Sequence, residues 1–163
     1  MINKYMPHVL VLPEDDANSR LANGFLLDLD YAALSRIQVL PEVGGWMVVL
    51  DTFLADHVAG MDRFPERYLV LLIDFDGEEG RLNYAKSRIP ERLKDRVFIV
   101  GAWTDPEALK RAGLGSSETI GRAVARDCRE ETDTTWGHDL LRHNTREIKR
   151  LRQHVRPFLF QDS

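Results

Sequence analysis

Residues 68–77 read YLVLLIDFDG, and this stretch decides the fold. Six consecutive apolar residues that favour β-structure are typical of a strand buried on both faces, as in a parallel sheet. The run ends in Asp74 and Asp76, and Gly77 then permits a turn. The sequence therefore predicts a buried parallel strand with two carboxylates directly after it.

Three further apolar runs lie on either side of this strand. They are HVLVL, IQVL and VFIV, at residues 8–12, 37–40 and 97–100. Helical patterns separate the four runs, over about residues 14–29, 46–58 and 78–88. Strands that alternate with helices form right-handed crossovers, so we expect a mostly parallel four-stranded sheet with helices on both faces, a Rossmann-like α/β fold.

Length and composition indicate one domain. The chain has 163 residues, 44% of them hydrophobic and 29% charged, which is typical of a single globular core. We expect the core over about residues 8–101 and a helical C-terminal extension over about 105–160, with its last helix at 137–154. No apolar stretch approaches the roughly 20 residues of a membrane span, and no leader is evident, so the expected location is the cytoplasm. The single cysteine, Cys128, is expected to be a structural thiol.

Acidic side chains follow two of the predicted strands. Glu14 comes after the first strand, and Asp74 and Asp76 come after the third. The carboxyl ends of parallel strands meet at one edge, where ligands bind. Three carboxylates there suit a hard cation such as Mg²⁺, although acids also favour turns and helix N-termini for local reasons. Further acids near these strand ends are Asp15, Asp16 and Asp105.

The segments PEDDANSRL and LLIDFDGEEGR together resemble the two signature elements of the Toprim domain of topoisomerases, primases and small nucleases. In that family a glutamate follows the first strand, and an Asp-x-Asp pair with a glycine follows a later one. The resemblance covers approximately residues 9–101. It implies a Toprim-like fold, in which Glu14, Asp74 and Asp76 are the metal-binding and catalytic acids.

The resemblance also implies an activity. We expect Mg²⁺- or Mn²⁺-dependent cleavage of phosphodiesters in DNA or RNA, with Asp74 and Asp76 holding metal. Glu14 would hold a second metal or act as a general base. Small nuclease-type Toprim proteins also suggest a separate ATPase as partner, in defence against foreign DNA.

Two alternatives remain open. The DFDG motif resembles the first motif of haloacid dehalogenase phosphatases, in which the first Asp is the nucleophile and the second is a general acid and base. That motif normally lies on the first strand. The chain could instead be a non-catalytic Toprim-shaped subunit that binds a partner protein. Pro13 and Asp15 beside Glu14, and the acidic turn at residues 127–139, are compatible with this second alternative.

Basic residues concentrate near the C-terminus. The segment 142–156 carries a net charge of +5 in a chain whose net charge is −4. We expect its cations to contact nucleic-acid phosphates, unless they form a solvated helix face; the residues named for this role are Arg142, Arg146, Lys149 and Arg150. His138 and His143 are five apart, which is unsuited to a zinc pair on one helix face. Monomer and homodimer both remain open.

Overall fold

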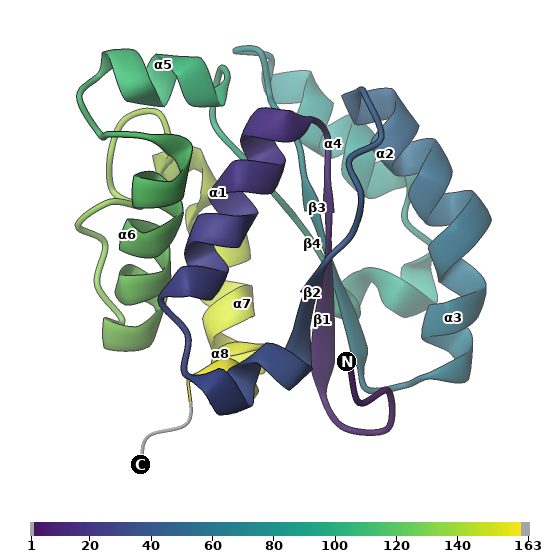
Figure 1. Cartoon of the computed structure of the whole chain (residues 1–163). Helices are drawn as coiled ribbons and strands as arrows, with labels where there is room; N and C mark the ends of the chain where they lie inside the picture. Colours follow the sequence, from purple (N-terminus) through teal and green to yellow (C-terminus); the bar gives the residue numbers. More distant parts are fainter. Residues whose placement is uncertain (1, 161–163) are drawn as a thin grey trace.

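The computed structural model describes residues 2–160 and confirms the predicted α/β class (Figure 1). Its sheet has four strands in the order β2-β1-β3-β4, and every neighbouring pair is parallel. The strands are β1 (His8–Pro13), β2 (Ile37–Val39), β3 (Arg67–Leu72) and β4 (Val97–Val100). The predicted strand positions are therefore correct to within one residue at each end.

The order of the strands sets where a ligand can bind. From β1 the chain crosses to β2 on one side, and it then returns past β1 to place β3 on the other side. The crossover helices consequently cover opposite faces of the sheet, and the carboxyl ends of β1 and β3 form the switch point, where ligands bind in open α/β sheets. β1 and β3 are the one pair of neighbouring strands in this sheet that are not consecutive in the chain, so no crossover helix joins them directly.

Helices cover both faces (Figure 1). One face packs against α1 (Asp16–Leu27), α6 (Ser117–Glu130), α7 (Thr145–His154) and α8 (Arg156–Leu159). The other packs against α2 (Trp46–Thr52), α3 (Val58–Arg63) and α4 (Glu79–Arg88). Side chains alternate along β1, so Val9 and Val11 enter the first core while Leu10 and Leu12 enter the second.

Short elements complete the chain. Short 3₁₀ helices precede β2, β4 and α7, namely η1 (Tyr31–Arg36), η3 (Glu91–Arg96) and η4 (Arg142–Asn144). The π-helical turn η2 (Phe53–His57) joins α2 to α3, so the helix predicted from Trp46 to Val58 continues to Arg63. Asp105 caps α5 (Pro106–Arg111) by accepting the backbone N–H of Ala108 at 2.8 Å. No helix within residues 2–160 combines the length and the apolar character that a bilayer crossing requires.

The last helix begins later than predicted. A helix was expected over residues 137–154, but residues 137–141 form turns and α7 starts at Thr145. Near the end of α6, the buried carboxylate of Asp127 accepts the backbone N–H groups of Thr134, Thr135 and Trp136. These hydrogen bonds hold the loop before α7 in a turn. The acidic turn at residues 127–139 is thus organised by hydrogen bonds to Asp127.

Side chains of α7 cover the free edge of β4. Asn144, just before the helix, accepts from Gly101 N at 3.2 Å, and Glu147 accepts from Ile99 N at 2.9 Å. Arg150 donates to Val97 O at 3.4 Å. The three residues are three apart and therefore share one helix face. They satisfy the backbone groups that a fifth strand would otherwise pair, which protects the sheet edge.

Two glycines allow α1 and α6 to touch through their backbones. A Cβ added at Gly24 would lie 2.2 Å from Glu118 O, and one added at Gly121 would lie 2.0 Å from Leu21 O. No side chain fits at either position without moving a helix. This contact fixes α6, which is part of the C-terminal extension, against the Rossmann-like core.

Gly121→Ala should therefore destabilise the protein by about 1–3 kcal/mol, because the added methyl group overpacks the helix contact. Gly80→Ala is the matched control, since Gly80 lies exposed in α4 with nothing within 4 Å of its added Cβ. That change should be neutral or stabilise by up to about 1 kcal/mol. Urea unfolding measures both free energies, and equal values for the two variants would contradict the close helix contact.

Candidate metal centre

The pairing of β1 with β3 brings Glu14 and Asp74 together. The ladder runs from the pair His8 and Arg67 to the pair Pro13 and Leu72, and Glu14 N extends it by donating to Leu72 O at 2.9 Å. Asp74 lies two residues after Leu72, and its backbone N–H donates to Glu14 Oε1 at 3.3 Å. Glu14 and Asp74, 60 residues apart in sequence, thus meet at the carboxyl ends of the two strands.

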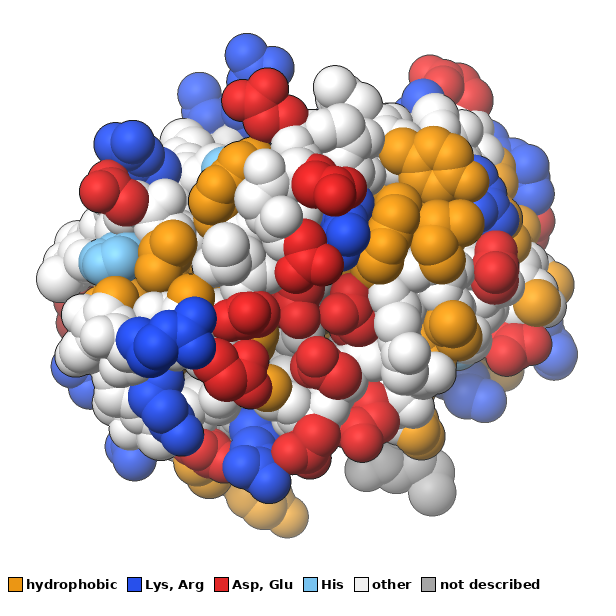
Figure 2. Space-filling model, turned by 90° about the horizontal axis from the view of Figure 1, so that it is seen from above, with side chains coloured by type: hydrophobic (Ala, Val, Ile, Leu, Met, Phe, Trp, Pro, Cys, Tyr) orange, Lys and Arg blue, Asp and Glu red, His pale blue; other side chains and the backbone are white. Residues whose placement is uncertain are grey.

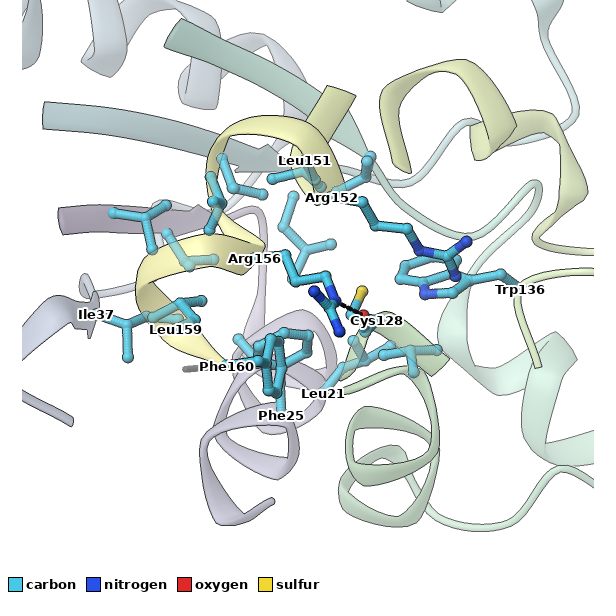
Figure 3. A pocket seen from close by; sticks show the side chains of 18 residues that line it. Leu21, Phe25, Ile37, Cys128, Trp136, Leu151, Arg152, Arg156, Leu159 and Phe160 are labelled. Atoms are coloured by element: carbon cyan, nitrogen blue, oxygen red, sulfur yellow. Dashed lines mark hydrogen bonds between the residues drawn. The ribbon is translucent and has the colours of Figure 1, made fainter. Parts of the chain in front are cut away.

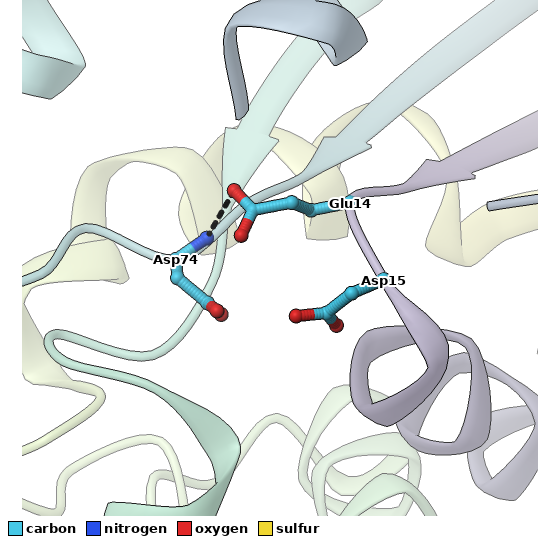
Figure 4. Close-up of side chains that lie close together, drawn as sticks. All are labelled: Glu14, Asp15 and Asp74. Carbon is cyan, nitrogen blue, oxygen red and sulfur yellow. Dashed lines mark hydrogen bonds between the residues drawn. The ribbon is translucent and has the colours of Figure 1, made fainter. Parts of the chain in front are cut away.

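Asp15 completes a group of three carboxylates. One oxygen from each of Glu14, Asp15 and Asp74 lies within 4.8 Å of the other two. Figure 4 shows the carboxylates of Asp15 and Asp74 pointing into the same space, with Glu14 above them. Asp74 is buried, whereas Glu14 and Asp15 are partly exposed. The group is therefore open to solvent on one side and closed on the other.

Asn18 holds two of the three carboxylates in place. Asp15 caps α1 by accepting the backbone N–H of Asn18 at 3.0 Å. The side-chain amide of Asn18 donates to Asp15 Oδ1 and to Asp74 Oδ1, both at 2.9 Å. Asn18 is itself buried, and its Oδ1 has no hydrogen-bond partner within residues 2–160. The first turn of α1 thus positions the site, a role that the sequence analysis did not assign to Asn18.

Burial dominates the electrostatics of the group. Removal from water raises the pKa of Asp74 from 3.8 to about 8, and the negative charges of Glu14 and Asp15 act in the same direction. The hydrogen bond from Asn18 opposes this shift only in part. Burial also raises the pKa of Glu14. A cation between these oxygens would offset the clustered negative charge, and proton uptake by Asp74 is the alternative way to relieve it.

Asp76 is not part of this group. Its backbone has a φ of 50°, followed by Gly77 at 70°, and its side chain is 60% exposed. Asp76 Oδ2 lies 3.4 Å from Arg81 Nη2. Arg81 is buried, donates to Asp74 O at 2.6 Å and stacks on Trp46 at 4.4 Å from the ring centroid. Of the three predicted acids, the structure thus brings Glu14 and Asp74 together with Asp15, and it places Asp76 beside an arginine.

The donor set fits a hard cation. All three carboxylates offer oxygen, the ligand that Mg²⁺ and Mn²⁺ prefer. Figure 2, which looks down on this edge of the molecule, shows acidic side chains gathered at its centre. Such a surface attracts cations. Within residues 2–160 no other group of three acidic, histidine or cysteine side chains comes as close together.

The remaining candidate acids and histidines have local roles. Asp16 forms an exposed ion pair with Arg20, and Asp105 caps α5. His143 packs against Phe75 and Trp103, and its Nε2 lies 2.8 Å from Gly101 O.

The basic segment divides into two parts. Arg150 bonds Glu147 at 2.8 Å, donates to Lys94 O and Val97 O, and stacks on Phe98 at 4.8 Å. Its charge is therefore used within the fold. The exposed cations of the segment are Arg142, Arg146 and Lys149. Of these, Arg142 and Arg146 lie two residues before and two residues after Asn144, which accepts from the backbone of Gly101 just beyond β4. They therefore belong to a segment at the carboxyl ends of the strands, where the acids also lie.

Asp74→Asn should change how stability depends on pH. Since the pKa of Asp74 is raised, the folded chain keeps a proton between about pH 4 and pH 8 that the unfolded chain releases. Without divalent cations, the stability of the wild type should fall as pH rises through this window, by at most about 1.4 kcal/mol per pH unit from this group. Asp74→Asn should flatten that slope.

Urea unfolding in the presence of a chelator, at several pH values, measures the effect. Asp76→Asn is the matched control, because its exposed carboxylate should leave the slope unchanged. A slope in Asp74→Asn equal to that of the wild type would show that Asp74 is not the desolvated group.

Comparisons with known proteins give no relative. No family model matches the chain, and no curated protein or solved structure matches it significantly. The resemblance to a Toprim domain therefore rests on the order of its acidic motifs and stays a prediction. Function must be argued from the site itself.

Proposed function

We propose that the protein binds Mg²⁺ or Mn²⁺ through Glu14, Asp15 and Asp74 and uses it to cleave phosphodiesters in nucleic acid. The observation that carries the proposal is the meeting of these three carboxylates at the switch point of a parallel sheet. An all-oxygen site of this kind, with one side open, leaves room for phosphate oxygens and water to complete the coordination of the ion.

The residues at the site would have different roles in the reaction. When bound, the cation supplies charge neutralisation to a phosphodiester and acidifies nearby water. Asp74 is buried and held by Asn18, so it would anchor the ion. Glu14 is partly exposed, so it would bind the ion from the open side, where water and phosphate oxygens can also reach it. Arg81 fixes the turn after β3 through Asp74 O and Asp76.

Cations at the same edge would hold the substrate. Arg142 and Arg146 are exposed near the start of α7, at the carboxyl end of β4. Arginine contacts to phosphate position nucleic acid without reading its sequence. The acidic surface at this end of the sheet (Figure 2) would repel a polyanion unless a cation occupies the carboxylate group. Nucleic-acid binding near the site should therefore depend on divalent ions.

A non-catalytic partner-binding subunit is the second candidate. The observation in its favour is that Arg150, Arg152 and Arg156 all donate to backbone carbonyls of the fold, which leaves few cations for nucleic acid. A phosphatase of the haloacid dehalogenase type is less well supported, because Asp76, its expected acid and base, pairs with Arg81. The cytoplasmic location, an ATPase partner and a homodimer remain predictions.

Cleavage assays test the first candidate. Asp74→Asn and Glu14→Gln should each reduce Mn²⁺-dependent cleavage of a mixed-sequence oligonucleotide by at least about 100-fold, because each removes a charged ligand of the ion, and loss of a group that only supports a metal ligand already costs about 10- to 100-fold. Asp76→Asn should lose less, because Asp76 lies beside Arg81. Asp16→Asn is the control at the same edge and should retain activity. If all variants cleave as the wild type does, the nuclease is a contaminant and the proposal is wrong.

A second test separates the two parts of the basic segment. Changing both Arg142 and Arg146 to Gln should weaken binding to all sequences alike, and it should flatten the salt dependence by up to about two units of slope. Arg92→Gln is the control, because Arg92 precedes β4 at the opposite edge of the sheet. Arg150→Gln should instead lower stability by about 1.5–3 kcal/mol, since it loses charged hydrogen bonds. Unchanged affinity in the double variant would favour the partner-binding candidate.

A further inference from the structure

Apolar side chains of this fold lie in two different settings. Some line a cavity of about 90 Å³ inside the helix layer, where Arg156 already donates to the backbone carbonyls of Cys128 and Arg129 (Figure 3). Others lie at the surface, close to the metal centre. Only the second setting is accessible to a ligand as large as a nucleotide.

Two aromatic side chains form this second setting. Trp46 is the first residue of α2 and Tyr84 lies in α4, and their ring centroids are 5.7 Å apart in an edge-to-face contact. Trp46 is partly buried against the core, whereas 43% of Tyr84 is exposed. Core packing therefore accounts for the position of Trp46 but not for the exposed ring of Tyr84.

Two contacts connect Trp46 to the acids of the metal centre. Gly44 N, two residues before Trp46, donates to Glu14 O at 2.8 Å. Arg81 stacks on the Trp46 ring at 4.4 Å from its centroid and donates to Asp74 O at 2.6 Å. Figure 2 likewise shows hydrophobic side chains next to the acidic ones, with a basic side chain between them. The aromatic pair is thus adjacent to the candidate metal site.

The ring of Tyr84 is held in one orientation. Arg88 Nη1 donates to the Tyr84 hydroxyl at 3.3 Å, and Arg88 is itself paired with Asp51 at 2.8 Å. A ring that is already fixed loses little conformational entropy when a flat ligand stacks on it. Because the charge of Arg88 is balanced by Asp51, phosphate attraction should contribute little here. A ligand of this surface should therefore bind mainly through a flat, aromatic face.

We infer that Trp46 and Tyr84 form a stacking platform for an unpaired nucleobase beside the metal centre. The inference rests on the proposed function, which places a phosphodiester at Glu14, Asp15 and Asp74. Bases within a duplex stack on one another, so only an unpaired base can be splayed onto an aromatic side chain. Such stacking tolerates any sequence, since every base has a π-face. The substrate would then be single-stranded nucleic acid, bound without strong base preference.

Binding of a thymidine oligonucleotide of about 12 nucleotides tests the platform without reference to cleavage. Fluorescence anisotropy measures its affinity for the full-length protein in Ca²⁺, which oxygen ligands also bind. Tyr84→Ala should weaken binding about 5- to 150-fold, the range for loss of one stacked base. Tyr84→Phe keeps the ring and should bind as the wild type does. Tyr31→Ala is the matched control, because Tyr31 is 91% exposed but lies before β2, at the opposite end of the strands.

Two further measurements separate stacking from other contacts. Tyr84→Ala should leave the salt dependence of binding unchanged, because stacking neutralises no phosphate. The indole N–H NMR signal of Trp46, identified by its loss in Trp46→Phe, should shift when the oligonucleotide is added. The duplex with the complementary strand should bind at least about fivefold more weakly than the single strand, and Tyr84→Ala should not alter its affinity.

Failure of the platform can be told apart from failure of the nuclease. Equal single-strand affinity in Tyr84→Ala and the wild type would overturn the platform, even if the wild type cleaves with Mn²⁺. Absence of single-strand binding by the wild type, or tighter binding of the duplex, would also overturn it. Single-strand affinity that depends on Tyr84, without Mn²⁺-dependent cleavage, would support the platform and contradict the nuclease.

Discussion

The parallel pairing of β1 with β3 is the constraint on which the rest of this structure depends. Six residue pairs join the two strands, and the hydrogen bond from Glu14 N to Leu72 O extends the ladder to the site. Because β2 lies on one side of β1 and β3 on the other, the helices divide between the two faces and both halves of the core form. The same arrangement makes the two acidic loops neighbours.

This geometry leaves a carboxylate where water solvates it poorly. Asp74 is only 7% exposed, yet it faces Glu14 and Asp15 within 4.8 Å. Clustered carboxylates are electrostatically unfavourable, and strongly shifted pKa values concentrate at functional sites for that reason. Asn18 bonds two of the three acids but leaves its own Oδ1 unpartnered within residues 2–160. The arrangement is easiest to understand if it serves to bind a cation.

Much of the fold could be predicted from the sequence, because buried strands and alternating helices leave strong local patterns. Glu14 and Asp74 could be placed together because both follow parallel strands. The role of Asn18 and the turning of Asp76 toward Arg81 could not, since they depend on the φ of 50° at Asp76 and on contacts across the site. Arg150 looked like a surface cation because its carbonyl partners at the start of β4 are about 50 residues away.

The central claim is that Glu14, Asp15 and Asp74 hold one divalent cation between them. Anomalous diffraction from crystals soaked in Mn²⁺ tests it most directly, because the signal marks the ion without reference to activity. The account predicts one strong peak within about 2.0–2.3 Å of an oxygen from each of the three side chains, the range for small hard cations. A peak at Asp76 alone, or no peak near the ends of β1 and β3, would contradict it.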